Sequence, residues 1–261
     1  ATYSIVPVAG PGLTGAVAVS TGGYHTCAVL SDGTVSCWST DSIVPVAVPG
    51  LTGAVAVSVG RDHTCAVLSD GTARCWGVND QGQLGDGTNN YSDVPVAVAG
   101  LTGAVAVSAG GSYYCDWDCY YFGHTCAVLS DGSARCWGSN GSGELGDGTD
   151  ASSSVPVAVS GLAGASAVSA GRAHTCALLE GGMAMCWGNN TSGELGDGTT
   201  ASRNNPADVE GLTGIVGISA GGAHTCALVG GGAISCWGRR DDGQLGEGQI
   251  NVGAEPRPVE G

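Results

Sequence analysis

The chain has 261 residues, of which 48 are glycine and 43% are hydrophobic, which is enough apolar material for a packed core. Its formal net charge is −15, and its eight basic residues are all arginines scattered along the sequence. Binding to nucleic acid needs a basic surface and anionic membranes repel acidic proteins, so nucleic acid is excluded as a partner. No apolar run approaches the roughly 18 residues that span a bilayer, so no membrane insertion is expected.

The sequence begins Ala1-Thr2-Tyr3 without a methionine. We interpret this as a mature chain whose signal peptide has been removed, or as a boundary chosen for expression. The first element that we expect is a short edge strand, Ile5–Ala9, whose pattern returns five more times. The six copies are Ile5–Ala9, Val44–Val48, Val94–Val98, Val155–Val159, Pro206–Glu210 and Pro256–Glu260.

A hairpin motif occurs five times, one time fewer than the edge strand. Each copy begins with His-Thr-Cys-Ala and carries a second cysteine, followed by tryptophan, ten residues after the first. The copies lie at residues 25–38, 63–76, 124–137, 174–187 and 224–237. Successive copies are 38, 61, 50 and 50 residues apart. A period near 50 residues in glycine-rich β-type sequence is typical of propeller blades, and we predict one repeat domain over residues 1–261.

The second repeat shows the four strands that we expect in each blade. Val44–Val48 is the edge strand, because a proline interrupts it, and Ala54–Ser58 alternates as an inner strand. His63–Leu68 and Thr72–Trp76 form the hairpin, and a polar loop over Gly77–Thr88 leads to the next edge strand. The predicted fold is all-β: a β-propeller or propeller-like array of about five four-stranded blades, with a surplus terminal edge strand that could fray, form a short sixth blade or pair with a neighbouring molecule.

The hairpin turn fixes which cysteines face each other. A three-residue loop, Ser69–Gly71, ends with a glycine that suits the left-handed conformation of such loops. Counting outward from this loop places Cys65 opposite Cys75, at a separation that a small adjustment converts into a disulfide. The same count works in all five repeats.

The twelve cysteines therefore form six predicted disulfides. The pairs are Cys27–Cys37, Cys65–Cys75, Cys126–Cys136, Cys176–Cys186, Cys226–Cys236 and, within an insertion, Cys115–Cys119. Disulfides persist in oxidising compartments, so we expect a secreted, extracellular protein. The alternatives are buried free thiols in a reducing compartment and a zinc site, although the spacing matches no zinc knuckle.

An aromatic insertion over residues 111–123 separates the second and third repeats. It holds six aromatic side chains that we predict to form an interface: Tyr113, Tyr114, Trp117, Tyr120, Tyr121 and Phe122. A rigid aromatic loop resembles the anchor region of a protein–protein interface. The alternatives are a lid folded back over its own blade and a platform on which sugars stack.

Histidines and acidic loops recur once in each repeat. The histidines are His25, His63, His124, His174 and His224. We expect each to bond backbone within its own blade rather than to bind metal, because no second ligand accompanies it. The acidic residues are Asp86, Asp147, Asp197 and Glu247. They lack the alternating ligands of calcium loops, so we predict that they cap backbone N–H groups and that the chain holds no cofactor.

Four triplets match the acceptor pattern for N-glycosylation. The asparagines are Asn90, Asn140, Asn189 and Asn190, and all lie in predicted loops. They fit an exported glycoprotein, although such triplets also arise by chance in loops of this composition.

The repeat resembles a known family. The pattern Ser-Ala-Gly-x-x-His-Thr-Cys-Ala-Leu at Ser169–Leu178, followed by Cys186–Thr199, is similar to the regulator of chromosome condensation repeat, and the resemblance covers nearly the whole chain. It implies blades of four antiparallel strands around a central axis. Eukaryotic members act as nucleotide exchange factors for the GTPase Ran and touch chromatin, whereas one secreted bacterial type inhibits β-lactamases. The best-known members have seven blades; this chain has five hairpins, and its first repeat lacks the polar loop.

No catalytic motif is present, and the serines, histidines and aspartates recur in every repeat, so we do not expect an enzyme. We predict a secreted structural or interaction protein that assembles with itself, into an extracellular filament or another assembly, through terminal strands and the aromatic loop. The alternatives are a secreted protein-binding module such as an enzyme inhibitor, and a lectin-like carbohydrate-binding module.

Overall fold

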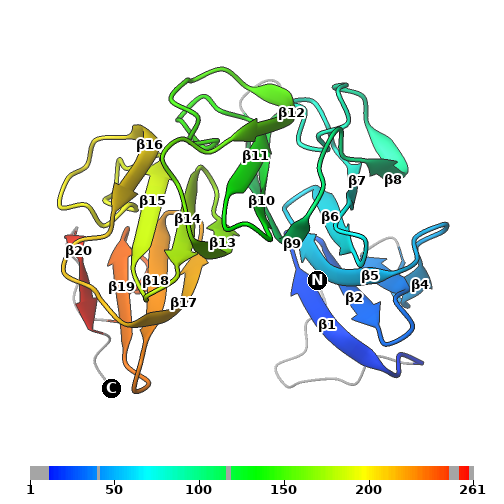
Figure 1. Ribbon diagram of the computed structural model, residues 1–261, viewed down its shortest axis with the longest axis horizontal. Helices are drawn as coiled ribbons and strands as arrows, with labels where there is room; N and C mark the ends of the chain where they lie inside the picture. The colour runs from blue at the N-terminus through cyan, green and yellow to red at the C-terminus, as the bar shows by residue number, and fades with distance from the viewer. Residues whose placement is uncertain (1–11, 40–41, 116–118, 247–252, 259–261) are drawn as a thin grey trace.

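The computed structural model describes residues 12–39, 42–115, 119–246 and 253–258, and of residues 113–121 and 253–258 no side chain. Within these ranges the regular structure consists of strands in five antiparallel four-stranded sheets. Each sheet is one blade, and its strands are neighbours in chain order. The blades follow one another around an open arc (Figure 1). This confirms the all-β, propeller-like fold. No helix that could cross a membrane occurs in the described ranges.

The strands are numbered through the five blades in order (Figure 1). Blade 1 holds β1 (Ala16–Thr21), β2 (His25–Leu30), β3 (Val35–Ser39) and β4 (Val46–Ala47). Blade 2 holds β5 (Ala54–Val59), β6 (His63–Leu68), β7 (Ala73–Gly77) and β8 (Ser92–Ala97). Blade 3 holds β9 (Ala104–Cys115), β10 (Cys119–Leu129), β11 (Ala134–Gly138) and β12 (Ser153–Ala158). Blade 4 holds β13 (Ala165–Ala170), β14 (His174–Leu179), β15 (Ala184–Gly188) and β16 (Arg203–Asp208). Blade 5 holds β17 (Ile215–Ala220), β18 (His224–Val229), β19 (Ile234–Gly238) and β20 (Gly253–Pro258).

The central hairpin of each blade has the geometry that the turn predicts. In blade 2 the Leu68 N–H donates to the Thr72 carbonyl at 2.8 Å, and Gly71 takes a φ of 77°. Cys65 then lies opposite Cys75 in the ladder. All five hairpins carry the predicted disulfide, each with a Cα–Cα distance of 4.1 Å. Closing each ten-residue loop removes conformational freedom from the unfolded chain and so stabilises the blade.

The edge strand belongs to the blade before the one that the sequence suggested. The segment Val44–Val48 contributes β4, which pairs with β3 of blade 1 and not with the strands of the second repeat. In that ladder Cys37 lies opposite Val46 and Ser36 opposite Ala47, and residues 49–53 then lead to β5 of the next blade. At the other end of the array β20 pairs with β19 and completes blade 5. The surplus copy is therefore Ile5–Ala9, which lies outside the described residues.

The core lies between blades rather than within them. Each blade has a back face, which packs on the following blade, and a front face, which packs on the preceding one. Between blades 2 and 3, Val67 and Ala73 of the back face cluster with Ala127 and Trp137 of the front face. Three further clusters join the other neighbouring blades in the same way. Small Ala and Val side chains let the sheets approach closely, so each blade depends on its neighbours.

Among the described residues, no blade packs on the front face of blade 1 or on the back face of blade 5. On the back face of blade 5, Leu228 is 43% and Ile234 46% exposed, whereas their equivalents in blade 4, Leu178 and Ala184, are 8% and 2% exposed. On the front face of blade 1, Val19 is 65% exposed, although the equivalent valines of later blades are half-buried. We call these two surfaces the end faces.

Candidate functional site

The polar loop after the third strand of blade 2 reaches onto the tryptophan of blade 3. The Gln83 carbonyl accepts both the Trp137 Nε1–H and the Thr125 hydroxyl at 2.9 Å. Leu84 is fully buried between the two blades. Gly85, with a φ of 70°, lies against the indole, and a Cβ there would come within 2.8 Å of the ring. The Gln83 carbonyl, Leu84 and Gly85 form one carbonyl–Leu–Gly unit. We call the surface around Trp137 and Thr125 that holds this unit the loop pocket.

The next two blade pairs repeat the loop pocket. Glu144 O accepts from Trp187 and Thr175, and Glu194 O accepts from Trp237 and Thr225. Trp137, Trp187 and Trp237 are all 0% exposed. Each of these three tryptophans is thus held by the loop of the preceding blade. The repeat pattern in the sequence did not reveal this contact between blades.

The acidic residues of these loops cap backbone groups, as predicted. Asp86, Asp147 and Asp197 each accept the N–H of the threonine two residues later. Glu247 lies outside the described residues. Among the residues that the structure describes, no three His, Cys, Asp or Glu side chains gather as a metal site would need.

Two of the four asparagines in predicted glycosylation triplets are buried. Asn140 and Asn190 are 0% exposed. The Nδ2 of Asn140, the atom that would carry a glycan, donates to the Thr149 carbonyl at 2.9 Å, and Asn190 makes the equivalent bond. These amides brace the loops from inside. Asn90 is exposed and Asn189 half-buried, so a glycan at these two positions stays a prediction.

The histidines connect neighbouring blades, which corrects the expectation of a bond within the own blade. His63 Nε2 lies 2.9 Å from Thr125 Oγ1, and the pairs His124–Thr175 and His174–Thr225 have the same distance. His25 pairs with Thr64 at 2.6 Å. Since the Thr125 hydroxyl donates to the Gln83 carbonyl, it accepts from the His63 Nε2–H. Burial lowers the pKa of His63, His124 and His174 to about 3, so these rings are neutral.

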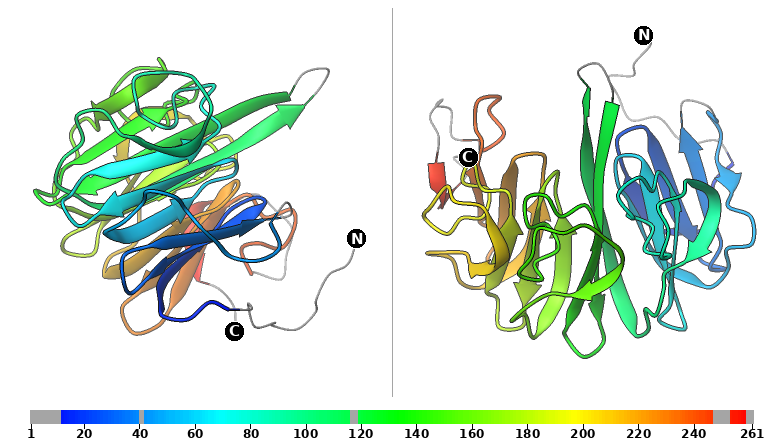
Figure 2. Two further views of the ribbon diagram at one scale, coloured as in Figure 1. Left: turned by 90° about the vertical axis from the view of Figure 1, so that its right-hand side faces the viewer. Right: turned by 90° about the horizontal axis from the view of Figure 1, so that it is seen from above.

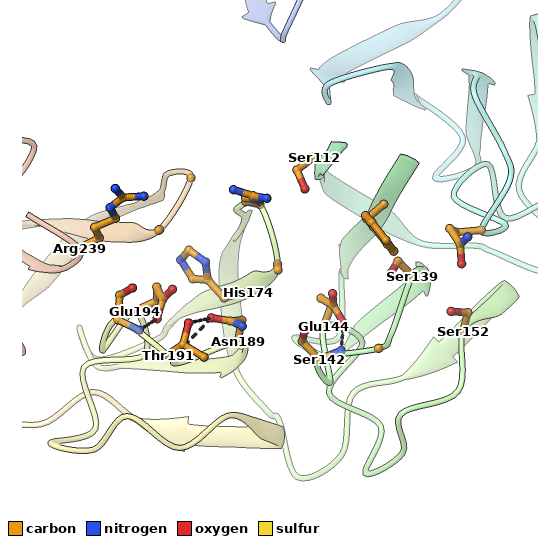
Figure 3. A pocket seen from close by; sticks show the side chains of 18 residues that line it. Ser112, Ser139, Ser142, Glu144, Ser152, His174, Asn189, Thr191, Glu194 and Arg239 are labelled. Atoms are coloured by element: carbon orange, nitrogen blue, oxygen red, sulfur yellow. Dashed lines mark hydrogen bonds between the residues drawn. The ribbon is translucent and has the colours of Figure 1, made fainter. Parts of the chain in front are cut away.

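A polar groove of about 590 Å³ lies on the loop side of blades 3 to 5 (Figure 3). Its lining residues include Phe122 of β10, Arg172, Arg239, Glu144 and Glu194. Sequence reasoning missed this groove, because its residues come from separate repeats and Phe122, His174 and Asn189 were singled out for three unrelated roles.

The two glutamates of the groove bond to the backbone of their own loops. Glu144 accepts the Ser142 N–H at 2.8 Å, and Glu194 accepts the Ser192 N–H at the same distance. In blade 2 the equivalent residue is Gln83, which accepts the Gln81 N–H at 2.9 Å. An amide therefore replaces the carboxylate in the same role. Burial raises the pKa of Glu144 and of Glu194, since the charged form loses solvation.

Replacing Glu144 by glutamine should stabilise the protein at neutral pH. A carboxyl whose pKa is raised on folding contributes stability below its unfolded pKa and loses it as the pH rises through the folded pKa. At pH 7 the wild type therefore buries a charge that Glu144→Gln removes. We expect thermal unfolding at pH 7 to occur a few degrees higher for the variant, and the difference to vanish near pH 4. Glu180→Gln, at an exposed position, is the control. A variant less stable than wild type at pH 7 would contradict this reading.

The aromatic insertion extends β9 and β10 beyond the other strands as a two-stranded ribbon (Figure 2). In its ladder Cys115 lies opposite Cys119, and Phe122, 39% exposed, lies opposite Ser112. The ribbon runs outward, unlike a lid folded over its blade. The side chains of Tyr113, Tyr114, Tyr120 and Tyr121, the Cys115–Cys119 disulfide and all of Trp117 lie outside the described residues.

Comparison with solved structures shows the same architecture in proteins of low sequence identity. The chain aligns with yeast RCC1 (Prp20) bound to Kap60 at 20% identity and a TM-score of 0.81, over 94% of this chain and 61% of that one. A second structure of Prp20p from Saccharomyces cerevisiae, titled for its binding to Gsp1p and histones, gives 20% identity and 0.79, over 94% and 63%. Human WBSCR16 gives 22% and 0.79, over 93% and 66%. The chain thus spans less than two thirds of each of these chains.

The family models match most of the described blades. A model of the regulator of chromosome condensation (RCC1) repeat matches residues 70–115, 131–178 and 182–228. A second model of the same repeat matches residues 16–42, 54–83, 165–194 and 215–244. Curated protein sequences give no match. The matched repeats cover more than half of the sequence, and this chain belongs to the RCC1 repeat family.

Proposed function

We propose that this chain is a non-catalytic, secreted interaction protein that binds further copies of itself through its two end faces. One observation carries the proposal. Leu228 and Ile234 at one end occupy positions that every internal blade pair buries, and Val19 at the other end occupies a position that every internal blade pair half-buries. Each end face is apolar and has the shape that packs on the opposite face inside the array. Such a surface favours association with the opposite end face of a second chain.

The polar groups of the end faces match as well. Inside the array each histidine pairs with the threonine of the following blade. In the described part of the chain His224 has no following blade, and Thr26 of blade 1 has no preceding one. Docking blade 5 on blade 1 of a second copy would pair these two residues. Such a contact is heterologous, and it forms a ring if the rotation closes or a filament if it does not.

Secretion and the lack of catalysis rest on supporting observations. The five hairpin disulfides are typical of proteins in oxidising compartments. The titratable groups of the groove have structural roles that recur between blades. The yeast relatives, whose titles name protein partners, support a role in protein binding for this architecture.

Association should be visible by sedimentation velocity and should disappear in Leu228→Asp, because a charge cannot be buried at that interface without a partner. Val216→Asp is the matched control. Val216 lies in the same blade and is 59% exposed, but its equivalents Val55 and Val105 are exposed in internal blades too. Deleting residues 1–10 separates this route from pairing through the surplus strand. A chain that stays monomeric throughout, or a control that fails equally, would overturn the end-face model.

The groove favours a second candidate function, the binding of another protein. Phe122 and two arginines, Arg172 and Arg239, line the groove, and aromatic residues and arginine are common at interface anchors. A monomer that associates with a different secreted protein, and loses this partner in Phe122→Ala, would favour the inhibitor-like alternative. A response on a glycan array would favour the lectin-like one.

A further inference from the structure

The loop pocket between blades 1 and 2 differs from the other three in its loop. The connection from β7 to β8 spans residues 78–91, whereas the connection from β3 to β4 spans only residues 40–45. Blade 1 therefore lacks the residues that would place a carbonyl, a leucine and a glycine on Trp76 of blade 2.

A cavity of about 490 Å³ lies where that loop would be, and Cys37, Val46, Val48, Thr64 and Trp76 are among its lining residues. This volume falls in the range of about 300–1,000 Å³ that is common for ligand sites. Trp76 is half-buried, whereas the tryptophans of the three filled pockets are fully buried.

The apolar part of the cavity matches the site that holds Leu84 in the next blade pair. Val46 lies opposite Cys37 in the ladder of blade 1, as Val96 lies opposite Cys75 in blade 2. Cys75, Val96 and Val98 pack in one cluster with Leu84. The cluster that holds the equivalents Cys37 and Val48 has no counterpart of Leu84, and Val46 is 51% exposed.

The polar part of the cavity has the same two hydrogen-bond donors as the filled pockets, a threonine hydroxyl and a tryptophan Nε1–H. Thr64 pairs with His25 at 2.6 Å, as Thr125 pairs with His63. In the filled pocket the Thr125 hydroxyl and the Trp137 Nε1–H both donate to one carbonyl. Among the described residues no carbonyl takes that place for Thr64 and Trp76. At the rim, Arg61 lies 5.0 Å from the ring centre of Tyr24 and donates to its hydroxyl at 2.8 Å.

We propose that this cavity is a binding site for a loop of a partner protein that presents a backbone carbonyl, a leucine and a glycine in succession. The carbonyl accepts from Trp76 and Thr64, the leucine side chain fills the pit beside Cys37, and the glycine lies flat on the indole. In the three filled pockets, the equivalent surfaces of this chain hold such a unit. The site is separate from the end faces and does not depend on self-association.

The test uses the full chain and a cyclised peptide with the sequence of residues 78–89, which is the loop of blade 2 itself. The six tryptophans give six indole N–H signals in a ¹H–¹⁵N spectrum, and Trp76→Phe identifies that of Trp76. We expect this signal to shift saturably below about 1 mM peptide. Peptides with Leu84→Ala or Gly85→Ala should bind at least about tenfold more weakly, since one loses the apolar anchor and the other places a Cβ on the indole.

A loop graft in the protein provides the matched control. Replacing residues 39–42 by residues 77–92 gives blade 1 the loop that it lacks. We expect the graft to move the Trp76 signal toward the position of the bound state and to abolish peptide binding. No shift at millimolar peptide, equal binding of the Gly85→Ala peptide, or binding that survives the graft would overturn the proposal. So would displacement of the peptide by an oligosaccharide that binds more tightly, because the site would then recognise sugar.

Discussion

Gly146→Ala should destabilise the protein by about 2–4 kcal/mol, whereas Gly161→Ala should cost only about 1 kcal/mol. Both glycines have nearly the same left-handed conformation, with φ values of 67° and 70°. A Cβ at Gly146 would lie 2.7 Å from Trp187 Nε1, whereas a Cβ at Gly161 meets nothing within 4 Å. The pair therefore separates the strain of alanine at positive φ, which both share, from the displacement of a buried indole.

The displacement also affects a hydrogen bond. Trp187 Nε1 donates to the Glu144 carbonyl at 2.8 Å, and a tilted ring loses this bond. Urea unfolding with disulfides intact, followed by tryptophan fluorescence, measures the difference. Gly146→Ala should also show a red-shifted native emission, because the indole gains solvent. Equal midpoints for the two variants would mean that the loop does not hold the tryptophan, and the filled loop pockets would lose their energetic importance.

The protein should lose stability steeply as the pH falls from about 6.5 to 5. The pKa of His63, His124 and His174 is about 3 in the folded chain, below the usual value of 6.5, because the rings are buried. A group whose pKa is lowered on folding stabilises above its unfolded pKa and loses that stability as the pH falls. Each proton taken up on unfolding contributes about 1.4 kcal/mol per pH unit, so the three rings approach about 4 kcal/mol per unit. Glu144 and Glu194 act in the opposite direction and reduce the slope toward pH 5.

A single substitution tests the origin of this pH dependence. His124→Gln removes one titrating ring and retains a side-chain donor toward Thr175. The slope of the unfolding free energy against pH should fall by up to about 1.4 kcal/mol per pH unit, which is the share of one ring, even if the variant is less stable at pH 7. Urea unfolding at several pH values between 7 and 5 gives both slopes. A wild-type stability that is flat over this range would show that the histidines are accessible to protons in the folded state.

The central hairpin of each blade could be predicted from the sequence, whereas the place of the edge strand and the contacts between blades could not. A glycine at the third turn position and cysteines ten residues apart specify register locally, so the hairpins and five disulfides were predictable from adjacent residues. The partner of a histidine, by contrast, lies in another repeat, and identical repeats offer several equivalent threonines. The same degeneracy explains why Val44–Val48 was assigned to the wrong blade, since its sequence fits either neighbour.

The burial of individual side chains could not be predicted from the sequence either. Asn140 and Asn190 match the glycosylation pattern, yet the same amide that would accept a sugar braces a loop from inside. Trp76 has the same sequence context as Trp137, and its exposure follows from a deletion in the preceding blade. Equivalent residues in two copies of one motif therefore differ in exposure because their neighbouring blades differ. The arrangement of the blades, and not the motif itself, distinguishes a structural residue from a candidate binding residue.

The most direct test of end-to-end association is to mix two variants that each block a different end. Val19→Asp blocks the front face of blade 1, and Leu228→Asp blocks the back face of blade 5. Each variant alone should sediment as a monomer. Because each retains one intact face, an equimolar mixture should form one-to-one dimers and nothing larger. Val17→Asp, at an equally exposed valine whose equivalents stay exposed inside the array, should associate like wild type. A mixture that remains monomeric while the wild type associates would contradict the account, because the contact would then not join these two faces.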